Sequence, residues 1–276
     1  MTIKKLTLTK NSAHLLVIDV GNTDATFGIF DGENLLHNFR IKSLKDENYV
    51  YFEYRFRQYF LENNLRFADI TKVVLSSVVP PLTPVFKSLI QNLFGLDPIV
   101  VNAYIFPTLT VSIDNPDEIG SDLVANAVAA YTKYGRNCVV VDFGTALTFT
   151  VVSAEGKVLG VSIAPGLRTA VKALFSNTAQ LPEVPLELPT SVLGKNSVHA
   201  IQSGILWGYE GLVKNMIQKV RAELGGDCIA IATGGLSSII STLKDEFVEV
   251  NRELTLEGLR IIGESRLYAI QNQINS

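Results

Sequence analysis

Two segments about 120 residues apart repeat one pattern, and this repeat constrains the fold more than any other feature of the sequence. Residues 15–30 read LLVIDVGNTDATFGIF, and residues 139–152 read VVVDFGTALTFTVV. In each segment an apolar run ends in Asp, turns at a glycine and continues as a second run rich in β-branched and aromatic residues. This pattern predicts a β-hairpin. A repeat at such a long period indicates a duplicated domain rather than a solenoid.

The rest of the chain alternates between predicted strands and predicted helices, which favours a mixed α/β fold. Helices are expected at 49–64, 82–94, 122–134 and 197–223, and strands at 72–79 and 228–232. Hydrophobic residues make up 47% of the chain and charged residues 18%, so a disordered chain is excluded. We expect two similar halves, residues 13–118 and 119–276, with a cleft between them.

The chain carries little net charge. Lys and Arg total 24 and Asp and Glu total 27, so no global attraction to nucleic acid or an anionic membrane is expected. Apolar runs such as 15–18 are far shorter than the roughly 20 residues that span a bilayer. Residues 1–14 are predicted to be a short leader to the first strand rather than a secretion signal. The only cysteines, Cys138 and Cys228, fit a reduced cytoplasmic protein.

Each Asp-x-Gly turn is suited to binding phosphate together with a cation. A glycine turn exposes backbone N–H groups, Asn and Thr side chains add donors, and Asp provides a hard carboxylate for Mg²⁺. A single copy could be an ordinary hairpin, whereas two matched copies favour a pair that binds one polyphosphate chain. The candidate residues are Asp19, Gly21, Asn22 and Thr23 in the first copy and Asp142, Gly144, Thr145 and Thr148 in the second.

A third glycine element lies at residues 229–236, which read IAIATGGL. It predicts a buried strand that runs into Gly234 and Gly235 and then into a helix over 236–243. A helix N-terminus at the end of a strand is a common place for nucleotides in α/β sheets. The sequence contains neither a P-loop nor a dinucleotide-binding fingerprint.

Phosphoryl transfer also needs a carboxylate that orients the accepting hydroxyl and takes its proton. Asp122, at the start of the predicted helix 122–134, is the candidate. The alternative is that Asp122 caps the helix or stabilises its first turn, which is a common use of Asp at that position. The residues alone leave both roles open.

The order of these motifs resembles the type III pantothenate kinase family. The similar motifs run from about residue 15 to residue 265 and include DVGNT at 19–23, NP at 115–116 followed by Asp122, DFGT at 142–145, APG at 164–166, NTA at 177–179 and TGG at 233–235. The resemblance implies the duplicated ribonuclease-H-like fold of the actin, sugar kinase and acetate kinase superfamily. It also implies a cytoplasmic homodimer that transfers the γ-phosphoryl group of ATP to pantothenate, the first step of coenzyme A synthesis, with Mg²⁺ and a monovalent cation, K⁺ or NH₄⁺.

The resemblance also assigns roles to single residues. It makes Asp122 the general base, and it places Asp142 and Asp19 at the cations. Gly120 and Thr178 would help to hold pantothenate. The ATP-binding residues that it implies are Asp19, Gly21, Asn22, Thr23, Gly144, Thr145, Thr148, Gly234 and Gly235, with the last two beside the adenosine.

This sequence departs from the family pattern where the acceptor would bind. The family's usual Gly-Ala-Asp-Arg is Gly-Ser-Asp-Leu here, so Leu123 replaces the Arg that would meet the pantothenate carboxylate, and Ile113 replaces a Tyr of the same pocket. Arg168 and Lys172 are alternative sources of positive charge. Three hypotheses therefore stay open: a pantothenate kinase with an altered carboxylate contact, a kinase for another small hydroxylated substrate, and a non-catalytic regulatory relative.

Overall fold

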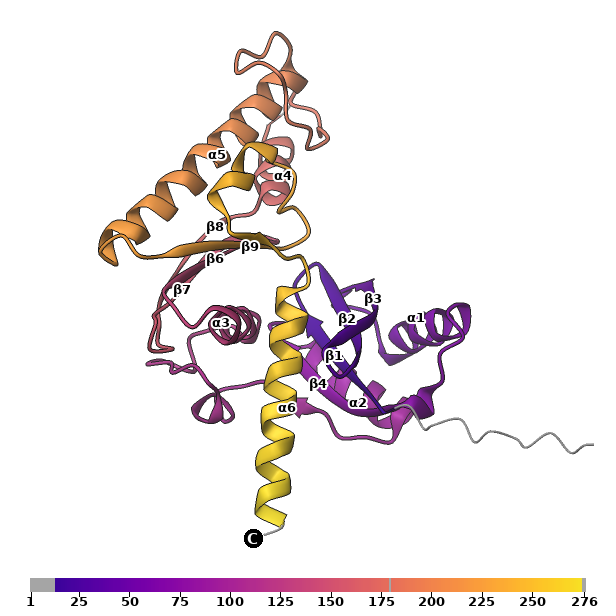
Figure 1. Ribbon diagram of the computed structural model, residues 1–276. Helices are drawn as coiled ribbons and strands as arrows, with labels where there is room; N and C mark the ends of the chain where they lie inside the picture. The colour runs from indigo at the N-terminus through magenta and orange to yellow at the C-terminus, as the bar shows by residue number, and fades with distance from the viewer. Residues whose placement is uncertain (1–12, 179, 275–276) are drawn as a thin grey trace, which may run out of the picture. The chain divides into compact units, whose positions relative to one another are not determined.

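The computed structural model describes residues 13–178 and 180–274, and it divides the chain into two compact units between Val100 and Val101 (Figure 1). The leader predicted for residues 1–14 lies almost wholly outside the described residues. Residues 101–118, which the sequence analysis assigns to the first half, belong to the second unit. The reason is local pairing: the Ser112 N–H donates to the Gly156 carbonyl, and the Val158 N–H donates to the Ser112 carbonyl.

The first unit is built on a five-stranded sheet with the order β3-β2-β1-β4-β5. β1 pairs antiparallel with β2 and parallel with β4. Its elements are β1 (His14–Val20), β2 (Asp24–Asp31), β3 (Asn34–Lys42), α1 (Tyr49–Glu62), η1 (Phe67–Asp69), β4 (Ile70–Ser77), α2 (Leu82–Phe94) and β5 (Ile99–Val100).

One face of this sheet packs against α1 and α2. Phe52, Phe56 and Phe60 recur every four residues along α1 and are buried, and the Phe27 ring of β2 meets the Phe56 ring edge-on at 4.6 Å. Because side chains alternate along a strand, the aspartate at the end of β1, Asp19, belongs to the opposite face. The side chain of Asp19 and the aromatic core that packs against β1 therefore lie on opposite faces of the sheet.

The second unit repeats the architecture, with a sheet in the order β8-β7-β6-β9-β10. Its elements are η2 (Phe106–Thr108), α3 (Ser121–Tyr134), β6 (Cys138–Phe143), β7 (Ala146–Val152), β8 (Val158–Pro165), α4 (Leu167–Ser176), α5 (Ser197–Glu223), β9 (Ile229–Thr233), η3 (Ser241–Glu246), β10 (Glu249–Val250) and α6 (Leu254–Ile274).

The two sheets have the same topology. In each unit the first three strands form an antiparallel meander. Two further strands follow after intervening helices, and they add to the edge formed by the first strand of the meander with parallel pairing. β6 thus corresponds to β1, and β9 corresponds to β4. This repetition confirms the duplicated ribonuclease-H-like fold that the repeated hairpins and the family resemblance predict.

Helices cover both faces of the second sheet. α4 and α5 lie on one side of it, and α3 and α6 lie on the other (Figure 1). Val139, Val141 and Phe143 of β6 join the core that contains α5, so Asp142, between them in the alternation, is on the face of α3 and α6. In the described part of the chain, no helix is long and apolar enough to cross a membrane.

The helix predicted at 236–243 is wrong. Residues after Gly234 form turns in which Ser237 N–H donates to Gly234 and Ile239 N–H donates to Leu236, and a short 3₁₀ helix follows only at Ser241–Glu246. Ser237, Ser238 and the β-branched Ile239 are weak helix formers, because serine competes for backbone bonds and β-branching restricts the side chain. The helix N-terminus expected directly after Gly234 and Gly235 is therefore not observed, and turns follow these glycines in the described structure.

Candidate functional site

The two aspartate turns are closed by equivalent backbone hydrogen bonds. The Gly21 N–H donates to the Asp24 carbonyl at 3.1 Å, and the Gly144 N–H donates to the Ala146 carbonyl at 3.1 Å. The first turn is one residue longer, since Val20 pairs with Ala25 whereas Phe143 pairs with Leu147. The predicted donors Asn22, Thr23 and Thr145 are all exposed at the turns.

Each aspartate lies in a row of hydroxyl side chains that crosses its sheet. In the first unit Asp19 is in register with Thr26 of β2 and with Ser76 of β4. Ser76 Oγ donates to Asp19 Oδ1 at 2.8 Å and is itself fully buried. The first row therefore places a hydroxyl donor against the side chain of Asp19 at the turn.

The second unit has the same row, with Thr148 of β7 and Thr233 of β9 in register with Asp142. The Oγ1 atoms of Thr148 and Thr233 are buried and lack a hydrogen-bond partner among the described residues. Unpaired buried hydroxyls are uncommon and call for an explanation such as an ion. Thr148 is predicted from the sequence, whereas Thr233 is not, because its position opposite Asp142 depends on strand pairing.

Glycines bring three chain segments close around the second turn. Gly234 has a φ of +90°, and a Cβ there would lie 2.5 Å from Asp142 Oδ1 and 2.7 Å from the Phe143 carbonyl carbon. A Cβ at Gly166 would collide with the carbonyl oxygen of Gly144. Gly166 N–H and Thr169 Oγ1 both donate to the Thr145 carbonyl, at 3.0 Å and 2.7 Å. The structure thus brings together Asp142, Gly144, Thr145, Thr148 and Gly234; Gly235 is exposed beside them.

Asp142 is also held by Asn126, a residue of the family motif Ala-Asn-Ala at 125–127 for which no role is predicted from the sequence. Asn126 of α3 is fully buried, and its Nδ2 donates to Asp142 Oδ2 at 3.1 Å. Thr255 of α6 donates to Asn126 Oδ1 at 2.8 Å. A polar Asn among the mostly apolar residues 125–130 indicates only weakly that the side chain is buried for a polar contact. Its partner, 16 residues along the sequence, can be identified only from the structure.

Asp122 lies in the first turn of α3, and its Oδ1 accepts the Leu123 N–H at 2.9 Å. Burial raises the pKa of Asp122, and hydrogen bonds from backbone N–H groups offset part of that rise. Asp122 precedes Asn126 by four residues, so the two share one face of α3 about 6 Å apart along its axis. The helix therefore carries the candidate base one turn from the residue that binds Asp142.

The residues predicted to hold the acceptor are more dispersed. Gly120 is the N-cap of α3, next to Asp122. Thr178 is exposed after α4, where its Oγ1 donates to the Leu174 carbonyl at 2.8 Å. Leu123 is 8% exposed and belongs to the buried side of α3.

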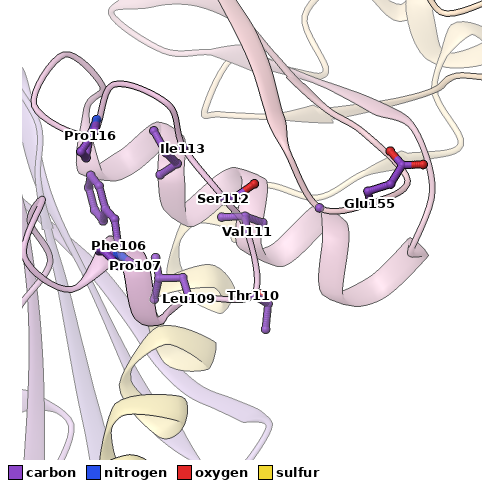
Figure 2. Close-up of a pocket in the computed structure, with 10 residues that line it drawn as sticks. Phe106, Pro107, Leu109, Thr110, Val111, Ser112, Ile113, Pro116 and Glu155 are labelled. Carbon is purple, nitrogen blue, oxygen red and sulfur yellow. The ribbon is translucent and has the colours of Figure 1, made fainter.

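Ile113 lines a pocket of about 260 Å³ (Figure 2). Most of its wall comes from residues 106–116, and Glu155 and Gly156 of the β7–β8 turn complete it. Most of the lining residues are apolar, and Thr110, Ser112 and Glu155 are the polar ones. Of the positions expected around the acceptor, Ile113 lines this pocket, whereas Asp122 and Gly120 do not.

The donor set around Asp142 fits Mg²⁺ or a monovalent cation. Its side-chain donors are a carboxylate and the two unpartnered threonine hydroxyls of its row, and hard cations prefer oxygen ligands of this kind. Among the described residues no group of three or more His, Cys, Asp or Glu could hold a metal. A single carboxylate at the turn is typical of sites in which Mg²⁺ takes its remaining ligands from substrate phosphates and water.

Comparison with known proteins connects this arrangement to one family. The family model for type III pantothenate kinase matches residues 15–219. The type III pantothenate kinase of Koribacter versatilis (strain Ellin345) is 42% identical over 260 residues, which cover 91% of this chain and 95% of that protein. The type III pantothenate kinase of Geobacter sulfurreducens is 41% identical over 250 residues, covering 91% of this chain and 98% of that protein.

Solved structures are similar at the level of the fold. A conserved protein from Campylobacter jejuni, assigned to the Baf family of transcriptional activators, superposes with a TM-score of 0.57 at 20% identity. The alignment covers 92% of this chain and 99% of that one. A reductive activator for a corrinoid, iron–sulfur protein superposes with a TM-score of 0.53 at 11% identity, covering 96% of this chain and 62% of that one.

Proposed function

Because the chain belongs to the type III pantothenate kinase family, we propose that it transfers the γ-phosphoryl group of ATP to the hydroxyl of pantothenate, forming 4′-phosphopantothenate and ADP. The observation that carries this proposal is the placement of Asp122 and Asn126 on one face of α3, with Asn126 bound to Asp142 at the second turn. A carboxylate that can take a proton thus lies near a carboxylate that can bind the cation of ATP.

Asp122 acts as the general base in this proposal. Its carboxylate orients the accepting hydroxyl of pantothenate and takes the proton as the new O–P bond forms. Burial raises the pKa of Asp122, which makes the carboxylate a stronger base than an exposed aspartate. Gly120 and Thr178 contribute to holding pantothenate.

Each aspartate turn is assigned to phosphate and cation binding. Asp19, Gly21, Asn22 and Thr23 form the first element, and Asp142, Gly144, Thr145 and Thr148 form the second. Gly234 and Gly235 lie by the adenosine. Mg²⁺ supplies charge neutralisation at the phosphate oxygens when bound. Asp142 and Asp19 are the ligands proposed for the cations, and a monovalent cation, K⁺ or NH₄⁺, is part of the proposal, as are a homodimeric state and a cytoplasmic location.

The direct test is ADP release by the purified protein with ATP, Mg²⁺ and K⁺, in the presence and absence of pantothenate. We expect ADP release that depends on pantothenate, a product whose mass is that of phosphopantothenate, and a lower rate when Na⁺ replaces K⁺. Turnover only with another small hydroxylated acceptor would replace pantothenate as the substrate. Binding of ATP without turnover of any acceptor would indicate a regulatory relative.

The charge lost at position 123 gives a separate prediction. Leu123→Arg should lower the KM for pantothenate by about 10- to 150-fold, because a charged hydrogen bond to a carboxylate contributes about 1.5–3 kcal/mol. KM and kcat for pantothenate are measured at saturating ATP. Since Leu123 is buried, the uncharged Leu123→Met variant serves as the control for altered packing. An unchanged KM would show that another group meets the carboxylate, and the exposed Arg168 and Lys172 of α4 are then the next positions to substitute.

A further inference from the structure

The amide of Asn126 takes no part in the reaction, yet this buried side chain donates a hydrogen bond to Asp142. It is fully excluded from solvent within α3, and its Nδ2 lies 3.1 Å from Asp142 Oδ2. An ionised carboxylate only accepts hydrogen bonds, so the amide must turn its NH₂ group toward Asp142. This contact fixes the orientation of the amide and directs its carbonyl oxygen away from β6.

Thr255 of α6 fixes the other end of the amide. Its Oγ1 lies 2.8 Å from Asn126 Oδ1, and because the amide oxygen only accepts, the threonine hydroxyl must donate. Thr255 therefore donates to Asn126, and Asn126 donates to Asp142, so that every hydrogen bond in the series points toward Asp142. This chain of hydrogen bonds connects α6 to the sheet through α3.

The crossing of α3 and α6 determines where the hydrogen-bonded residues Asn126 and Thr255 meet. The two helices lie side by side on the face of the sheet that bears Asp142 (Figure 1). A Cβ at Gly258 would overlap the Ala125 carbonyl oxygen and lie 2.5 Å from its carbon. Ala125 precedes Asn126 directly, and Gly258 follows Thr255 by three residues, so backbone contact aligns the two hydrogen-bonding residues.

The chain of hydrogen bonds orients the carboxylate of Asp142. Oδ2 is held by Asn126, whereas Oδ1 faces the glycines: a Cβ at Gly234 would lie 2.5 Å from Oδ1, and one at Gly144 would lie 3.5 Å from it. We propose that Asn126 is a positioning residue that directs Asp142 Oδ1 toward these two glycine turns, and that Thr255 holds Asn126 in place. The proposal rests on the role of Asp142 in binding the cation and polyphosphate of ATP stated above.

The test measures binding of Mg²⁺ with a non-hydrolysable ATP analogue by titration calorimetry at fixed K⁺, without an acceptor. Asn126→Leu removes both the donor and the acceptor of the amide at similar volume, and we expect about 10- to 100-fold weaker binding, the usual effect of removing a partner that orients a metal ligand. Thr255→Val removes only the hydroxyl at constant shape, and we expect binding between that of the wild type and that of Asn126→Leu. Thr255→Ser keeps the hydroxyl and should restore most of the affinity that Thr255→Val loses.

Two further comparisons separate positioning from general damage. In the Asn126→Leu background, Thr255→Val should weaken binding no further, because residues that act through one contact are not additive. In the kinetic assay, the variants should raise the KM for ATP by a larger factor than the KM for pantothenate.

Asp142→Asn is the reference variant. If it binds the analogue as the wild type does, the role assigned to Asp142 fails, and the positioning proposal fails with it. If Asp142→Asn binds weakly while Thr255→Val and Asn126→Leu bind as the wild type does, the positioning proposal alone is overturned. Should Asn126→Leu not fold, the pair Thr255→Val and Thr255→Ser decides: equal affinities would overturn the proposal.

Discussion

Replacing Asp122 with Asn should lower pantothenate-dependent ADP release by about 10²- to 10⁴-fold, the range that a general base typically contributes. The substitution is isosteric, and the amide oxygen can still accept the Leu123 N–H that Asp122 Oδ1 accepts at 2.9 Å. Helix α3 should therefore form normally, and Mg²⁺–ATP binding should persist. The measurement is the steady-state rate at saturating substrates, and Asp117→Asn, in the exposed loop before α3, is the matched control.

The same variant should be more stable than the wild type at neutral pH. Burial raises the folded-state pKa of Asp122 above its ordinary value, so the ionised form costs stability, and the wild type loses stability as pH rises from the unfolded pKa through the folded one. Asp122→Asn removes this cost. Its advantage in melting temperature should therefore be present at pH 7 and vanish at acid pH below the ordinary carboxyl pKa. A fully active variant, or one less stable at pH 7, would instead support a helix-capping role for Asp122.

The features that depend on local sequence were predictable. The hairpins follow from apolar runs interrupted by a glycine, and the long helix Ser197–Glu223 has the expected bounds. The helix at 82–94 is also observed as predicted. These elements are fixed by periodicity and by turn residues within a few positions, so a single sequence contains the information that specifies them.

The features that depend on distant contacts were not predictable. Thr255 and Asn126 are 129 residues apart, and nothing near either residue indicates that they meet. The apolar residues of 236–243 suggest a helix, but turn hydrogen bonds such as Ser237 N–H to Gly234 form instead. Residues 101–118 join the second unit through pairing of Ser112 with residues 156–158, which the positions of the repeated hairpins do not reveal.

The close crossing of α3 and α6 leads to the last prediction, which concerns stability. Gly258→Ala should lower the free energy of unfolding by about 1–3 kcal/mol, the usual cost of forcing an extra carbon into a packed core. The new Cβ would overlap the Ala125 carbonyl oxygen and lie 3.0 Å from its Cα, and this backbone cannot rotate away as a side chain can. The gain of about 1 kcal/mol in helix propensity from Gly to Ala is therefore outweighed.

Gly208→Ala provides the opposite outcome in the same chain. Gly208 lies within α5, and a Cβ there would have nothing within 4 Å among the described residues. Only the helix propensity should change, so this variant should be more stable than the wild type by up to about 1 kcal/mol. Urea unfolding of both variants at one protein concentration gives the comparison. If Gly258→Ala were stabilised as much as Gly208→Ala, the helices would not be in backbone contact at Ala125. In that case their crossing could not align Thr255 with Asn126. If Gly258→Ala instead destabilises the protein by shifting α6, it should also weaken Mg²⁺–ATP binding, because Thr255 precedes Gly258 by less than one turn.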